Sequence, residues 1–78
     1  MDQEYTVTVV LEPAEEGGFL VLVPALPEVV THGDTEREAL AMAEDAIRLA
    51  IEYRLDQGEA IPTPTTPTLR QVNVALPA

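Results

Sequence analysis

The sequence predicts an α+β fold, in which a small antiparallel sheet packs against one long helix in the order β-β-β-α-β. Short runs rich in β-branched residues, with apolar side chains at alternate positions, recur before a capped helix start, and one more follows the helix. At 78 residues the chain is near the lower size limit for an independent core, since such a domain buries only about 60% of its unfolded surface. We therefore expect one domain over residues 1–78, and oligomerisation or a partner to add burial.

Three strands are expected before the helix. The first covers residues 5–12, where apolar side chains alternate with more polar ones. A turn over residues 13–18 follows, since Pro13 ends the ladder and the next glycines permit positive φ. Residues 19–23 are apolar on both faces, as in a central strand. Two prolines then interrupt the pairing before a short third strand at residues 29–32.

The helix is expected over residues 36–57. Thr35 as N-cap and Glu38 three positions later form a capping box, and Gly58 suits the left-handed position after the helix. The stripe that should pack on the sheet consists of Leu40, Ala43, Ile47 and Ile51.

A second apolar group lies beside that stripe and consists of Met42, Ala46, Leu49 and Tyr53. The combined apolar arc of about 200° is wider than the roughly 100° that one sheet contact requires. Either the chain's own C-terminal segment covers this flank, or the flank is a protein–protein interface. We favour an interface for self-association in a homo-oligomer, because the domain is small.

The sequence after the helix divides into a proline–threonine stretch and a stretch of alternating apolar and polar residues. Residues 59–68 form a proline–threonine connector that should run extended, close to polyproline II. Residues 69–76 alternate again and predict a fourth strand, at a sheet edge or paired with a symmetry mate.

The charge is strongly acidic, with 4 Lys plus Arg against 14 Asp plus Glu and a formal net charge of −10. So few cations argue against direct nucleic-acid binding, and the charge favours a basic partner unless it serves only solubility. The longest apolar run, residues 19–26, is far too short for a bilayer. The acidic N-terminus is the opposite of a signal peptide, so we expect a soluble cytoplasmic protein without disulfides.

No catalytic arrangement emerges from the sequence. Most acidic residues have capping or solvation explanations, and only Glu12, at a strand end, is placed like a strand-borne metal ligand. His32 has no nucleophile nearby and is better explained as a surface residue. We expect no metal, no cofactor and no enzymatic activity.

Several motifs together resemble the HicB-like antitoxin family over nearly the whole chain. They are Gly17-Gly18-Phe19, then Pro24, Leu26 and Pro27, then Thr31-His32-Gly33-Asp34-Thr35, then Glu38-Ala39-Leu40 with Ala43 and Ala46-Ile47, and finally Gly58 with Ile61-Pro62-Thr63-Pro64. The resemblance implies a partial ribonuclease H-like fold, and a domain that binds and neutralises HicA, a small basic RNA-cleaving toxin. An acidic domain suits that role because it complements a cationic surface.

The chain departs from the family pattern in two places. Glu28-Val29 stands where the family commonly has Gly-Cys, which adds a charge to the loop. Many full antitoxins also carry a C-terminal DNA-binding module, whereas this chain ends at Ala78, so we expect no operator binding by it. The partner contacts we expect are Glu15, Glu16, Glu28 and His32.

Two rival interpretations stay open at this point. One is a degenerate metal-dependent nuclease of ribonuclease H-like type that uses Glu12 and neighbouring carboxylates. The other is an orphan oligomeric domain without a toxin partner.

Overall fold

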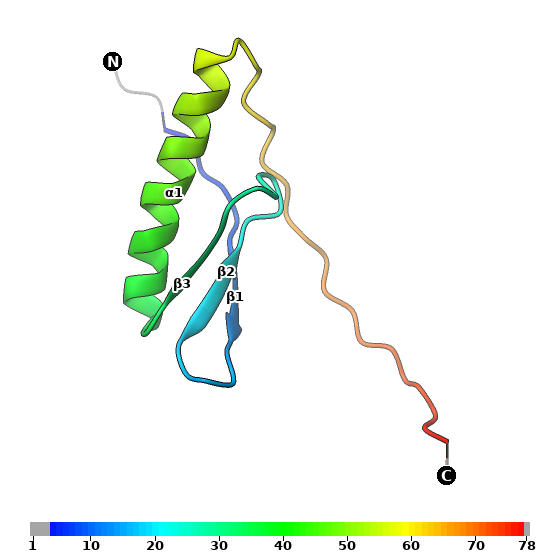
Figure 1. The fold of residues 1–78 in the computed structure, drawn as a ribbon. Helices are drawn as coiled ribbons and strands as arrows, with labels where there is room; N and C mark the ends of the chain where they lie inside the picture. Colours follow the sequence, from blue (N-terminus) through cyan, green and yellow to red (C-terminus); the bar gives the residue numbers. More distant parts are fainter. Residues whose placement is uncertain (1–3, 78) are drawn as a thin grey trace.

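The computed structural model describes residues 4–77 and shows a three-stranded antiparallel sheet with one long helix against one face (Figure 1). The elements are β1 (Val10–Pro13), β2 (Phe19–Leu22), β3 (Val30–Gly33) and α1 (Glu36–Asp56). The strand order is β1-β2-β3, so the wholly apolar β2 is central, as predicted. The predicted α+β class is therefore confirmed, with β2 and β3 within one residue of their expected bounds.

The first strand is shorter than predicted. Val10 pairs with Leu22, which is the last residue of β2. Pro24 follows almost immediately, and proline donates no ladder hydrogen bond. Residues 5–9 therefore have no strand partner, and only the last three residues of the expected strand over 5–12 belong to the sheet.

The helix begins and ends where its local signals predict. The Glu38 backbone N–H donates to Thr35 Oγ1 at 3.1 Å, and Glu38 Oε1 accepts from the Asp34 N–H at 3.3 Å. These bonds satisfy N–H groups that have no partner inside the helix. At the other end Gly58 has φ 76° and its N–H donates to the Leu55 carbonyl, which confirms the left-handed glycine.

A glycine brings β3 and α1 into very close contact. A Cβ on Gly33 would collide with the backbone N and Cα of Ala39. On its other side the Gly33 carbonyl oxygen lies 2.5 Å from where a Cβ on Gly18 would stand, and Gly18 itself has φ 77°. The glycines at 18 and 33 therefore allow the first hairpin, β3 and the helix start to meet at one point.

Two small apolar clusters hold the helix on the sheet. The first contains buried Val21, Ala39 and Ala43, and the second contains buried Val23, Leu26 and Val29, all from the β2–β3 loop. The second cluster also receives Tyr5, Val7, Ala46, Ala50 and Ile51, while Val9 and Ile47 touch both. Together they form the whole buried core of the described residues.

The stripe that packs on the sheet is shifted from the predicted one. Ala43 is buried and Ile47 and Ile51 pack as expected, but Leu40 is 40% exposed. Ala39 is fully buried in its place. The close approach at Gly33 explains the shift, because only a small side chain fits where the helix meets β3.

The predicted fourth strand does not form within this chain. Residues 59–77 contain neither helix nor strand, and they pass the β2–β3 loop and then leave the domain (Figure 1). The radius of gyration is 15.6 Å, against about 11 to 12 Å for a compact domain of this length. We call residues 59–68 the connector and residues 69–77 the C-terminal arm. The large apolar side chains of the arm are 73–86% exposed: Leu69, Val72, Val74 and Leu76.

Candidate protein-binding site

Three of the four expected partner contacts lie together at one end of the sheet. Glu15 and Glu16 are exposed in the turn between β1 and β2. His32 reaches the same turn from β3, with Nε2 3.3 Å from the Gly17 carbonyl oxygen. The register explains this, because His32 pairs with Leu20 near the start of β2. This end of the sheet thus presents two carboxylates and an imidazole, which we call the turn surface.

Glu28 lies at the opposite end of the sheet, in the β2–β3 loop, and it is engaged within the chain. Arg54 Nε and Nη2 each donate a 2.9 Å hydrogen bond to its two carboxylate oxygens. These side-chain bonds are the main reason why the pKa of Glu28 is lowered, and a backbone hydrogen bond and the Arg54 charge lower it further. The pair ties the loop to the last turn of the helix. No local pattern predicts it, because the partners are 26 positions apart.

The second apolar group of the helix is largely uncovered. Met42, Leu49 and Tyr53 are 47%, 65% and 63% exposed. Ala46, which we expected in the same group, is half-buried against the second core cluster. The C-terminal segment does not cover this flank, so the first of the two explanations for it is wrong.

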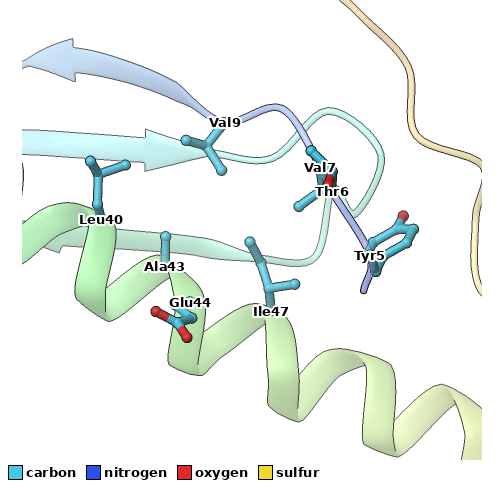
Figure 2. Close-up of a pocket in the computed structure, with 8 residues that line it drawn as sticks. All are labelled: Tyr5, Thr6, Val7, Val9, Leu40, Ala43, Glu44 and Ile47. Carbon is cyan, nitrogen blue, oxygen red and sulfur yellow. The ribbon is translucent and has the colours of Figure 1, made fainter. Parts of the chain in front are cut away.

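A groove lies between residues 5–9 and the helix (Figure 2). It has a volume of about 330 Å³ and lies beside the segment that precedes β1 in the chain. Figure 2 shows Leu40, Ala43 and Ile47 directed from the helix toward the segment that carries Val7 and Val9. One wall carries Tyr5, Thr6, Val7 and Val9, and the other carries Leu40, Ala43, Glu44 and Ile47.

The acidic residues between positions 4 and 77 do not converge on a metal site. Within residues 4–77, no three His, Asp or Glu side chains are placed to hold an ion. Glu12 is exposed on β1, and in the sheet register Leu20 separates it from His32. Residues 4–77 likewise include no helix with the length and apolar character needed to span a bilayer.

Comparison with known proteins gives a consistent result. Residues 4–78 match the family HicB-like_2, described as HicB_like antitoxin of bacterial toxin-antitoxin system. The protein named Antitoxin HicB 1 of Photorhabdus laumondii is 52% identical over 63 residues, which cover 81% of this chain and 39% of that protein. Antitoxin HicB of Escherichia coli is 40% identical over 57 residues, 73% of this chain and 41% of that protein.

A shorter relative matches over most of its own length. A UPF0150 protein of Thermoplasma acidophilum is 44% identical over 55 residues, which cover 70% of this chain and 80% of that protein. The matched part of this chain spans about two fifths of the HicB relatives.

These matches define the class of protein, a family described as antitoxins of bacterial toxin–antitoxin systems. More particularly, the chain belongs to the HicB-like antitoxin family. The predicted resemblance is therefore confirmed.

Proposed function

We propose that this domain neutralises a small basic RNA-cleaving toxin of the HicA type by covering its cationic surface. The observation that carries this proposal is the family match over residues 4–78 in a chain with a formal net charge of −10. A toxin that binds RNA needs a cationic surface to neutralise phosphates. An acidic domain competes for that surface by charge complementarity.

The turn surface is the proposed toxin contact. Glu15 and Glu16 are exposed there, and in the described structure neither carboxylate is held by an arginine of the chain. Such carboxylates remain available to an external cation. His32 adds a donor or acceptor at the same place. Glu28 is a weaker candidate because its two oxygens already accept from Arg54.

The role requires binding and no chemistry by this chain. A domain that occupies the toxin's RNA-binding surface inhibits cleavage without a nucleophile, a metal or a general base. We therefore propose a non-enzymatic antitoxin and assign no catalytic residue.

The test is calorimetric titration of the full chain with a purified HicA-type toxin, together with an RNA-cleavage assay. We expect a complex that abolishes cleavage and whose affinity falls as salt screens the charges. Glu16→Lys should weaken binding by about tenfold, equivalent to about 1.4 kcal/mol.

The matched control is Glu52→Lys, which makes the same change of charge on an exposed position of the helix. This variant should bind much as the original chain does. No binding at low salt would overturn the proposal. If Glu16→Lys and Glu52→Lys reduced the affinity for the toxin equally, the turn surface would not be the toxin contact. The net charge of the domain alone would then account for the effect.

A further inference from the structure

We propose that the C-terminal arm adds a strand to a second copy of this chain, along that copy's residues 5–9 and β1. The arm has the residue pattern of a half-buried strand, with Val72, Val74 and Leu76 on one side and Gln71 and Asn73 on the other. Every residue of the arm is exposed. An alternating apolar segment without a partner is suited to pairing with a free sheet edge.

The accepting edge is available in the structure. β1 is an outer strand of the sheet. In the described chain, no backbone–backbone hydrogen bond joins residues 5–8 to another segment. Unpaired N–H and C=O groups along such an edge are a template for another strand. β3 is the less suitable edge, because it ends where Gly33 meets the helix.

The groove beside this edge fits the apolar side of the arm. It holds about 330 Å³ between Val7 and Val9 on one wall and Leu40 and Ile47 on the other (Figure 2). A strand laid along residues 5–9 would direct alternate side chains over it. Burial of one valine or leucine contributes about 1.5 to 3 kcal/mol. The arm would also cover Leu40, which is 40% exposed in the single chain.

The connector explains why the arm pairs with another copy rather than with its own edge. Tyr5 Oη donates to the Pro62 carbonyl oxygen at 2.6 Å, which holds this part of the connector beside residue 5. The connector then carries prolines that keep it extended at about 3.1 Å per residue. Leu69 is therefore roughly 20 Å farther on, whereas the whole edge over residues 5–12 is about 26 Å long. Over this distance the chain leaves the domain, so the arm begins away from the chain's own edge and projects beyond the domain (Figure 1).

A reciprocal exchange gives a closed dimer. Each copy would donate one arm and accept one, so the same surfaces are used twice about a two-fold axis. In this arrangement residues 69–76 form the strand that their pattern predicts, and the edge at residues 5–8 gains a hydrogen-bonding partner. The helix flank of Met42, Leu49 and Tyr53 is the competing surface for self-association, and the experiment separates the two.

The first test measures the mass of the full chain in solution by light scattering and sedimentation. We expect a dimer at micromolar concentration. Val72→Glu with Val74→Glu should weaken it by at least about tenfold. Gln71→Glu with Asn73→Glu, which adds the same charge on the other side of the arm, should leave it intact. Circular dichroism should show the same helix content in all variants, because the arm makes no contribution to the folded domain.

Two outcomes overturn the proposal. One is a monomer at every concentration tested, since the arm then remains unpaired. The other is an oligomer that tolerates the Val72 and Val74 substitutions but is dissolved by Leu49→Glu, since the helix flank is then the interface. Neither outcome involves the toxin, so failure here is distinct from failure of the antitoxin proposal.

The second test distinguishes pairing between copies from pairing within one chain. The sequence contains no cysteine, so single cysteines can be introduced at Thr6 and at Asn73, which lie on the same side of the proposed pair. Under oxidising conditions, a mixture of Thr6→Cys and Asn73→Cys chains should form a cross-linked heterodimer. A cross-link that appears only within single chains carrying both substitutions would overturn exchange. Absence of both cross-links, with Gln71→Cys tried in place of Asn73→Cys, would overturn the placement.

Discussion

The central strand and the C-terminal arm are built from the same kinds of residue and differ completely in their surroundings. Val21 of β2 is fully buried between two neighbouring strands and the helix, whereas Val72 and Val74 of the arm are 81% and 73% exposed. Short turns on both sides of β2 bring its neighbours into reach, while a stiff connector carries the arm away. A strand is stabilised by its partner strands and by a covered face, so apolar alternation alone is not sufficient.

The largest expected effect on stability comes from comparing a leucine of the core with a leucine of the arm. Leu26 is fully buried in the second core cluster, so Leu26→Ala should destabilise the domain by about 3 kcal/mol. That is a large part of the roughly 4 to 12 kcal/mol expected for a domain of this length. Leu76 is 86% exposed, so Leu76→Ala should change the free energy of unfolding by less than about 0.5 kcal/mol.

Both variants are measured by urea unfolding at a concentration low enough to keep the chain monomeric. Equal losses would mean that the arm packs on its own domain. In that case the contrast between the two regions disappears.

The next test concerns the point where β3 meets the helix. Gly33→Ala should destabilise the domain by about 2 kcal/mol, because the added methyl collides with the backbone of Ala39. Combining it with Ala39→Gly should restore little, since the backbone N and Cα of residue 39 remain in place. Thermal unfolding of the two variants measures this. Full recovery in the double variant would show that the Ala39 methyl was the obstacle.

A smaller effect is expected at the helix start. Thr35 Oγ1 accepts the Glu38 N–H at 3.1 Å, so Thr35→Ala should cost about 1 kcal/mol of stability, while Thr35→Ser should be nearly neutral. Urea midpoints of the two variants give the comparison. Equal losses for alanine and serine would assign the effect to the threonine methyl rather than to the cap.

The features that local sequence predicts well are those that depend on near neighbours. The helix bounds follow from Thr35 and Gly58, and the hairpin between β1 and β2 follows from the glycine turn. The first strand was predicted too long because its pairing ends with β2 at Leu22, a limit set by another segment. Residues 69–76 have the pattern of a strand, but a strand forms only beside a sheet edge, and in this structure the segment leaves the domain without a partner (Figure 1).

In the candidate site, too, the features set by near neighbours are predictable from the sequence and those set by distant segments are not. The acidic turn with Glu15 and Glu16 is visible in the sequence, and its position beside His32 follows once the strands are in register. The engagement of Glu28 by Arg54 is not visible there, since it depends on the loop folding back to the last turn of the helix. Charge counts alone cannot distinguish a free carboxylate from one held within the chain.

The smallest expected effect is on the pH dependence of stability, which tests the hydrogen-bonded pair of Glu28 and Arg54. Arg54 lowers the pKa of Glu28 below its ordinary value of 4.5. A carboxylate with a lowered folded-state pKa stabilises the fold above its unfolded-state pKa, and this contribution is lost as pH falls through the folded-state value. Glu28→Gln should therefore be slightly less stable than the original chain at neutral pH and equally stable at pH about 2.

Urea midpoints at the two pH values measure the difference. Arg54 stays charged throughout, so Glu28 alone titrates within the pair. In a background of Arg54→Gln, the same Glu28→Gln change should lose most of its pH dependence, because the hydrogen bonds that lower the pKa are gone. If Glu28→Gln remained less stable than the original chain at acid pH, the Glu28 side chain would contribute through packing rather than through its charge. The Glu28 carboxylate would then be a candidate for contact with a partner.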